Sequence, residues 1–186
     1  MKKISLKLLL LAALTSLAAP SYADLYLGGS AGQIKASDAC DGLITTKCDD
    51  SDSAYKLFGG FRFGKFVALE AFYTDLGKIS ATTTTVEAEA EEHTFGAAVV
   101  GILPVSKNFD LFAKLGVHRW DADGKGTGQN QFATVRVNVD DSGTDIMGGL
   151  GMSYSFTDSF AIRAEWENYE AGDNYDMFSA GITFGF

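Results

Sequence analysis

Residues 177–186 at the carboxyl end read Met-Phe-Ser-Ala-Gly-Ile-Thr-Phe-Gly-Phe, and their side chains alternate in character. One face of an extended strand would carry only apolar residues: Phe178, Ala180, Ile182, Phe184 and Phe186. A repeat of two residues is typical of β-structure, because successive side chains of a strand point to opposite faces. In a soluble protein the apolar face would cover a core. In a transmembrane barrel it would face lipid, and the small or polar face would line the interior.

Seven further segments show the same alternation: 25–35, 54–63, 66–75, 92–103, 109–120, 144–156 and 160–169. The segment 92–103 is the least decided of them, because both of its faces are small and apolar. Each segment is close to the roughly 9–11 residues that a tilted strand needs to cross a bilayer. The pattern predicts an all-β fold, an eight-stranded antiparallel up-and-down transmembrane β-barrel. Its lipid-facing residues would include Leu57, Leu69, Leu115, Ile162 and Ile182.

The connections between these segments alternate in length. Short turns are predicted at 64–65, 104–108 and 157–159, and polar loops at 37–53, 76–91, 121–143 and 170–174, the last of them shorter. Short turns on one side and long loops on the other are the arrangement of outer-membrane barrels. Aromatic residues near the segment ends, Tyr26 among them, are expected to form the two interfacial girdles.

The amino end has the features of an export signal. Lys2, Lys3 and Lys7 precede an apolar run over 8–17, and the triplet 21–23, Ser-Tyr-Ala, offers a small-x-small cleavage site. This run is shorter than the about 20 residues of a membrane-spanning helix, although an N-terminal anchor remains the alternative. We therefore expect a cleaved signal peptide over 1–23, a barrel domain over 24–186, and a place in the bacterial outer membrane.

Charge and cysteine usage agree with export. Removing the three lysines of the signal would take the formal net charge from −9 to −12, and an acidic chain without a basic patch argues against nucleic-acid binding. Cys40 and Cys48 would meet an oxidising compartment, so we predict a disulfide between them. Closing so short a loop stabilises by about 2–3 kcal/mol in the chain-entropy account. A metal or redox pair is the alternative, but the spacing is not CxxC and no histidine is nearby.

Three stretches carry a resemblance to a known family. Residues 57–77, LFGGFRFGKFVALEAFYTDLG, resemble the second hairpin of the OmpA transmembrane domain. Residues 113–123 resemble the fifth strand of that domain, and 162–166, Ile-Arg-Ala-Glu-Trp, its seventh. The terminal Phe186 resembles the carboxyl-terminal signature of bacterial outer-membrane barrels and is expected to be an assembly signal read by the barrel-assembly machinery. OmpA proper continues into a peptidoglycan-binding domain; this sequence ends at Phe186, so a barrel-only relative without that function is expected.

The resemblance also implies a cluster of charged side chains inside the barrel. Glu70, Lys114, Arg163 and Glu165 match it by position, with Glu70 and Arg163 as cross-barrel partners, and strand phase adds Lys56. The cluster could be a plug that fills and rigidifies the barrel, or an ion gate that works by exchanging the partners of Glu70 and Arg163. Because eight strands leave room for side chains rather than a channel, the structural role is the first expectation.

The two histidines, His93 and His118, are the residues that would suggest an enzyme. Some eight-stranded outer-membrane barrels acylate or deacylate lipid A with a histidine and a serine or aspartate, which needs nucleophile, base and orienting group within hydrogen-bond reach. Neither histidine lies in a motif of that kind. The acidic runs 49–52 and 87–92 could bind Ca²⁺ weakly but lack a defined ligand register. We therefore expect no catalytic site, no metal and no cofactor.

These expectations combine into a monomeric barrel with a structural or surface-interaction role, in contact with outer-membrane lipid and lipopolysaccharide. A narrow ion-conducting pore is the alternative, and a lipid A-modifying enzyme a more distant one. A soluble lipocalin-like secreted barrel would instead place the apolar residues inside. The sequence does not identify a partner for the external loops, because loops vary freely on such a scaffold.

Overall fold

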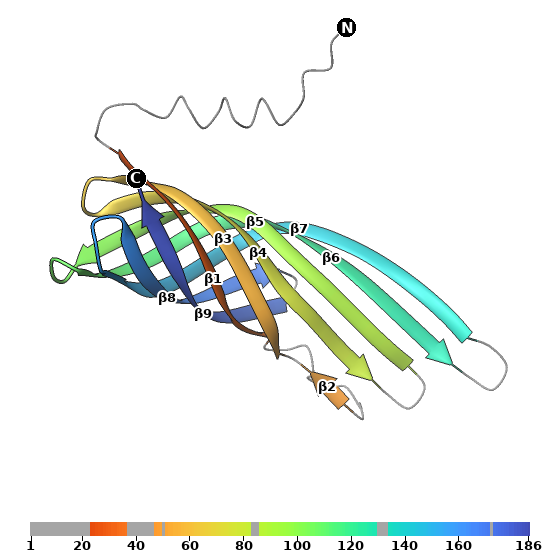
Figure 1. The fold of residues 1–186 in the computed structure, drawn as a ribbon. Coiled ribbons are helices and arrows are strands. Elements are labelled where there is room, and N and C mark those ends of the chain that lie inside the picture. Colours follow the sequence, from red (N-terminus) through yellow and green to blue (C-terminus); the bar gives the residue numbers. More distant parts are fainter. Residues whose placement is uncertain (1–22, 37–46, 50, 83–85, 130–133, 172) are drawn as a thin grey trace, which may run out of the picture.

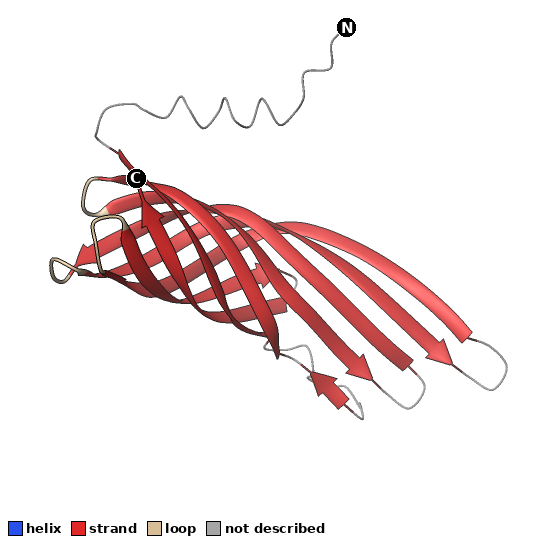
Figure 2. Ribbon diagram, in the orientation of Figure 1, coloured by secondary structure: helices blue, strands red, loops and turns tan. Residues whose placement is uncertain are grey.

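The computed structural model describes residues 23–36, 47–49, 51–82, 86–129, 134–171 and 173–186, all of them in strands or short turns (Figure 2). The strands are β1 (Ala23–Ala36), β2 (Lys47–Asp49), β3 (Ser51–Phe63), β4 (Val67–Thr82), β5 (Val86–Pro104), β6 (Phe109–Gln129), β7 (Thr134–Ser155), β8 (Phe160–Ala171) and β9 (Asp173–Gly185). Among these residues no helix has the length and apolar character required to span a membrane.

All strands except β2 form one closed antiparallel barrel (Figure 1). The hydrogen-bonded order runs β4-β3-β1-β9-β8-β7-β6-β5, and pairing of β4 with β5 closes the ring. The start of β1 and the carboxyl terminus lie at the same end of the barrel, as an even number of strands requires (Figure 1). The predicted eight-stranded antiparallel barrel is confirmed.

The outer wall of the barrel is apolar and the inner wall is polar or tightly packed. Leu57 is 67% exposed and Leu115 66%, and the other three predicted lipid-facing residues, Leu69, Ile162 and Ile182, also point outward. In segment 92–103, whose two faces the sequence did not distinguish, Phe95 and Val99 point outward, whereas Ala98 and Val100 are buried. This outward apolar belt confirms the predicted register and argues against a lipocalin-like arrangement, in which these side chains would point inward.

The predicted loops 76–91 and 121–143 were wrong wherever the structure describes them. Strands β4, β5, β6 and β7 continue through these stretches and project past the barrel as a sheet (Figure 1). Part of the predicted loop 37–53 is also strand, since β2 pairs with the end of β4 and β3 begins at Ser51. Above the membrane both faces of a strand meet water, so the apolar alternation disappears while the backbone pairing continues. We call the part of β4–β7 beyond the barrel, residues 78–82, 86–92, 121–129 and 134–146, the extension.

A β-bulge marks the point where the barrel wall becomes the extension. The β4–β5 register shifts between Asp75 and Lys78, and Gly77 has a φ of +76°. Lys78 N donates to Asp52 Oδ2 at 2.8 Å, and Gly77 N donates to Asp75 Oδ1 at 3.0 Å. A Cβ on Gly77 would lie 2.9 Å from Asp52 Oδ2, so the turn needs glycine for both conformation and space.

Aromatic residues lie at both ends of the apolar belt. At the end with the short turns, Tyr154 contacts Phe156 at 5.1 Å and Phe184 contacts Phe186 at 5.0 Å between ring centroids. At the other end, Tyr73 pairs with Phe95 and Trp166 with Phe178. These two rings of outward aromatics match the interfacial girdles of membrane barrels. Tyr26 was wrongly assigned to a girdle: its neighbours Leu25 and Leu27 take the outward phase, which turns Tyr26 into the lumen.

Candidate functional site: the filled lumen

The outer half of the lumen is closed by apolar side chains. Near the extension these are Ile34, Leu76, Trp120, Met147, Tyr169, Tyr175 and Met177, all buried. Trp120 lies against Gly143, where a Cβ would meet its ring at 2.6 Å, and its Nε1 donates to Asp145 at 2.8 Å. We call these residues the outer apolar layer. It separates the rest of the lumen from the side on which the extension projects.

Below this layer lies a cluster of six buried charged residues. Lys56 comes from β3, Glu70 from β4, Lys114 from β6, and Arg163, Glu165 and Glu167 from β8. Their inward phase follows directly from the alternation of each strand. We call these six residues the charge cluster. It contains three cations and three carboxylates, so its formal charges cancel.

Lys114 is the centre of the charge cluster. Its Nζ lies 2.6 Å from Glu70 Oε1, 2.8 Å from Glu165 Oε2 and 3.0 Å from Glu167 Oε1. Arg163 Nη1 lies 2.8 Å from Glu70 Oε2, and its Nε contacts Glu165. Lys56 contacts Glu165 and lies 2.5 Å from Glu167 Oε2. Every member has at least two oppositely charged neighbours, which offsets the large cost of removing each charge from water.

Tyrosines and phenylalanines complete the surroundings of these charges. The Tyr26 hydroxyl donates to Glu70 Oε2 at 3.0 Å, and the Tyr169 hydroxyl donates to Glu167 Oε2 at 3.2 Å. The Arg163 guanidinium lies 4.2 Å from the Phe112 ring centroid and 4.6 Å from that of Phe58. Cations over aromatic faces are attracted by the ring quadrupole, so the two rings hold the guanidinium in place.

The structure brings together all four residues that the family resemblance suggested, with Lys56 beside them. Sequence reasoning did not include Glu167 in the cluster, and it missed Tyr26. Strand phase was the available signal for both residues. It could not show which inward groups meet, because that depends on how far each strand is offset around the barrel.

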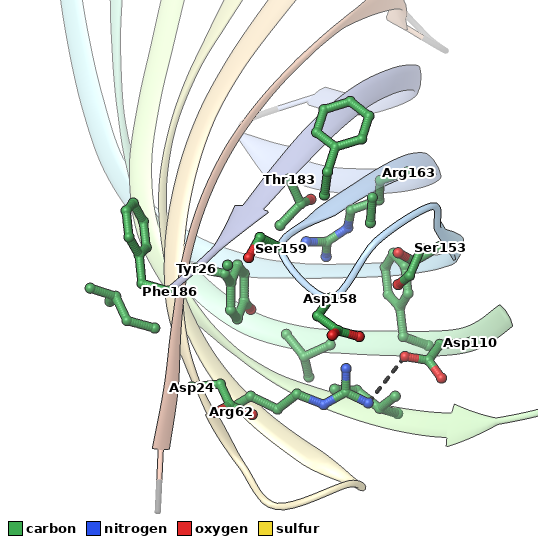
Figure 3. Close-up of a pocket in the computed structure, with 18 residues that line it drawn as sticks. Asp24, Tyr26, Arg62, Asp110, Ser153, Asp158, Ser159, Arg163, Thr183 and Phe186 are labelled. Atoms are coloured by element: carbon green, nitrogen blue, oxygen red, sulfur yellow. Dashed lines mark hydrogen bonds and ion pairs between the residues drawn. The ribbon is translucent and has the colours of Figure 1, made fainter. Parts of the chain in front are cut away.

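A cavity of ≈ 470 Å³ opens at the end of the barrel with the short turns (Figure 3). Arg62 Nη2 and Asp110 Oδ2 form an ion pair of 3.0 Å in its wall, and Asp24 and Asp158 also line it. Tyr26 and Arg163 form its inner end, so the cavity stops at the charge cluster. We call this cavity the vestibule.

The two histidines have different environments. His118 is buried, with Nδ1 2.5 Å from Thr94 Oγ1 and its ring 5.4 Å from that of Tyr169. Thr94 donates its only hydroxyl proton to the Arg119 carbonyl at 2.9 Å, so His118 Nδ1 is the donor in the shared hydrogen bond. A histidine acting as general base would accept that proton instead. His93 lies outside the lumen near Tyr73, with ring centroids 6.2 Å apart.

Several predicted features are not tested by the described residues. Cys40 and residues 1–22 lie outside them, so the disulfide with Cys48 and the signal peptide stay predictions. Phe186 N donates to the Leu25 carbonyl at 2.9 Å, which anchors the terminal residue to β1; its part in assembly also stays a prediction. Within the described part of the chain, no group of three or more His, Cys, Asp or Glu residues is arranged to hold a metal.

Comparison with known proteins shows to which family and to which solved structures this barrel is similar. The family model described as "OmpA-like transmembrane domain" matches residues 20–180. The structure is similar to that of Ail, the attachment invasion locus protein of Yersinia pestis, with a TM-score of 0.56 and 16% identity over 88% of this chain and 97% of that one.

Two further outer-membrane barrels are similar. OprG from Pseudomonas aeruginosa has a TM-score of 0.55 and 12% identity, covering 89% of this chain and 96% of its own. Neisserial surface protein A has a TM-score of 0.53 and 10% identity, covering 89% and 98%. At these identities the likeness concerns the fold. The search of curated protein sequences gave no match.

Proposed function

This chain is an outer-membrane barrel of the OmpA-like transmembrane domain family, and we propose that it serves in the outer membrane as a surface-binding protein. The extension would be its binding part. The filled barrel is the membrane anchor. The extension offers one edge of its sheet to extended segments of other molecules.

The observation that carries this proposal is the unpaired edge of β7. The strand pairs with β6 from Thr134 to Tyr154, but with β8 only from Met147 to Ser155. In the described part of the chain, residues 134–146 therefore have no strand on their second side. The opposite edge of the extension is different, because β2 pairs with the end of β4.

An unpaired edge exposes backbone N–H and C=O groups that can form a ladder with another chain. Most proteins block such an edge with lysine, proline or a covering element. Residues 134–146, TVRVNVDDSGTDI, contain neither lysine nor proline, and Val137 and Val139 are 53% and 59% exposed. An added strand would gain backbone hydrogen bonds, and the valines would contact its side chains.

The lumen supports this role by making the base rigid. The outer apolar layer and the charge cluster fill the barrel with side chains that contact one another across it. We propose that the cluster is a structural plug, because three cations and three carboxylates hold each other from four different strands. A rigid barrel limits the conformational entropy that the extension loses when it binds.

The charge of the extension limits the chemistry of its partner. Among the extension side chains that the structure describes, the exposed or half-buried acids outnumber the bases: Glu91, Asp121, Asp123, Asp140, Asp141 and Asp145 against Lys78 and Lys125. The hydrogen bond from Lys78 lowers the pKa of the Glu91 carboxyl, which keeps it charged. The Ail structure with the heparin analogue sucrose octasulfate holds a polyanion. The acidic extension of this chain would repel such a ligand, so we propose that the partner is an extended protein segment rather than a polyanion.

Selection of random 12-residue peptides on the protein in lipid nanodiscs tests the proposal. We expect bound peptides to slow amide hydrogen exchange in residues 134–146. The double change V137K/V139K should weaken the binding about tenfold or more, because lysine side chains block edge pairing. S106K/S159K is the matched control: it adds the same charge in two short turns at the other end of the barrel. Peptides that protect only other segments would contradict an edge-binding role.

A narrow pore is the second candidate, favoured by the vestibule. The cavity reaches as far as Arg163 and Tyr26. Among the described residues, the charge cluster and the outer apolar layer separate it from the opposite side. Rearranging the partners of Glu70 and Arg163 would have to open both. Single-channel recording in planar bilayers distinguishes the roles: a structural plug gives no conductance, whereas a gate gives openings that Glu70→Gln alters.

The remaining parts of the proposal concern contacts and turnover. We propose no enzymatic activity, supported by the direction of the Thr94–His118 hydrogen bond. The mass of lipid A should be unchanged when the protein is expressed. Outer-membrane lipid and lipopolysaccharide would surround the apolar belt, the barrel-assembly machinery would read the strand that ends at Phe186, and the protein would be a monomer within its own membrane.

A further inference from the structure

We propose that the free edge of β7 pairs with the same edge of a second copy held in an opposing membrane, so that two molecules join two surfaces. This inference rests on the proposed function, because it names the partner of the same edge. It is carried by three observations: the unpaired backbone, the order of residues along it, and the direction in which the extension projects.

The residues of the edge are complementary to themselves when two copies run antiparallel. With Asn138 of each copy at the centre, Val137 of one faces Val139 of the other on both sides of the centre. One step further out, position 136, an arginine, faces Asp140 of the second copy, again twice. Opposite charges and β-branched pairs directly across an antiparallel ladder are stabilising, and like charges are destabilising.

A parallel arrangement of the two edges would bring like charges together. In register, it would place Asp140 against Asp140 and Asp141 against Asp141 of the second copy, with like charges side by side. It is also excluded by geometry. Two barrels in one membrane are related by an axis along the membrane normal, and strands tilted by about 35–45° would then cross at roughly 70–90° rather than pair.

Antiparallel pairing requires a different axis. The two-fold axis of an antiparallel ladder of identical strands is perpendicular to the sheet, and the sheet of the extension continues the barrel wall (Figure 1). The axis therefore lies in the membrane plane, and the two barrels point in opposite directions. The strands keep the same tilt to the normals of both membranes, so the two membranes are parallel and face each other.

The length of the extension fits this arrangement. The last outward apolar residue of β7 near the membrane is Ile146, and Thr144 and Ser142 follow on the same face. Eight residues separate Ile146 from the centre at Asn138. At about 3.3 Å per residue and a tilt of about 40°, this raises the centre roughly 20 Å above the membrane. The two surfaces would then be roughly 40 Å apart, which leaves space for the described ends of β6 and β7 at Gln129 and Thr134.

A cysteine placed at the centre tests the register. In a C40S/C48S background, N138C should form a disulfide between two copies under mild oxidation, because the two residues face each other. S142C is the matched control on the same face: it faces position 134 in the antiparallel register and should stay reduced. Equal cross-linking at both positions would indicate in-register parallel contact and would overturn the proposal.

Charge exchange tests the pairing without a covalent link. R136D and D140R should each reduce clustering of protein-bearing vesicles about tenfold, because each places like charges across the ladder. A mixture of the two variants should cluster again, since each of the two cross-pairs between positions 136 and 140 then joins an aspartate of the R136D copy to an arginine of the D140R copy. The double variant R136D/D140R should cluster alone.

Three outcomes would overturn the inference. In the first, the mixture of R136D and D140R vesicles does not regain clustering. In the second, vesicles that carry either variant alone cluster as strongly as wild-type vesicles. In the third, N138C forms no dimer at protein concentrations at which vesicles cluster. Selected peptides can still protect residues 134–146 in these cases, so the proposed edge-binding function would survive. Loss of peptide protection as well would remove both.

Discussion

At the scale of single residues, the central relation is between Glu70 and Arg163, which lie 2.8 Å apart inside the charge cluster. Glu70→Ala removes one carboxylate from a balanced set and leaves three buried cations facing two carboxylates. Breaking a buried pair in this way costs about 3–5 kcal/mol. We expect urea unfolding from lipid vesicles to show a loss of that size. The double variant with Arg163→Ala should recover part of it, because the excess positive charge is removed and the charges balance again.

The ion pair between Arg62 and Asp110 is the matched control for this cycle. Their side chains are 30% and 21% exposed at the vestibule wall, so water screens them. Alanine at either position should cost no more than about 1 kcal/mol, and the two losses should be nearly additive. Additive losses for Glu70 and Arg163 as well would show that the lumen is wet and that the plug account is wrong.

Leu115 tests the lipid-facing register. It is 66% exposed near the middle of the barrel part of β6, residues 109–120. Leu115→Arg should destabilise folding into vesicles by about 2–4 kcal/mol if the residue lies near the bilayer midplane. Leu111→Arg on the same face, nearer the short turns, should cost about 1 kcal/mol or less. Equal costs at both positions would place the membrane elsewhere on the barrel.

At the scale of elements, Gly77 separates the barrel part of β4 from its extension part. Gly77→Ala introduces a Cβ at positive φ and 2.9 Å from Asp52 Oδ2, so we expect faster amide exchange in residues 78–82 while 67–75 stay protected. Gly101→Ala is the control, because its nearest neighbour atom to a Cβ is 4.0 Å away. No difference between the two variants would show that the bulge does not order the extension.

The predicted disulfide belongs to the same scale. Cys48 lies in β2, the strand that covers the second edge of the extension. Mass spectrometry of non-reduced peptides should find Cys40 linked to Cys48, and reduction should loosen β2 without unfolding the barrel. Two free thiols in protein purified from membranes would contradict this prediction.

Sequence alternation was sufficient for the elements that cross the membrane. Lipid on one side and packed polar groups on the other impose opposite demands on successive residues, as in Leu69 and Glu70. The same reasoning failed for 121–129 and 134–143, because water on both faces removes that contrast. It also assigned Tyr26 to a girdle by its nearness to a strand end, although its phase pointed inward. Partners such as Lys114 and Glu167 depend on strand offset, which alternation does not reveal.

At the scale of the whole molecule, one continuous sheet has two different tasks. Its lower part closes on itself, which satisfies every backbone group that lipid would leave without water. Its upper part opens, because β8, β9 and β1 end while β4–β7 continue. The change occurs where the outward side chains turn from apolar to polar, as between Ile146 and Thr144. The open edge is therefore confined to water, where it can meet another chain.

Amide hydrogen exchange along β7, followed by NMR in lipid nanodiscs, tests this account most directly. In residues 147–155 both sides of the strand are paired, so successive amides should all exchange slowly. In residues 134–146 every second amide points to the free edge, so slow and fast exchange should alternate at low protein concentration. Uniformly slow exchange there would mean that the edge is already covered, and uniformly fast exchange would mean that the extension is not a sheet. Either result would contradict the account.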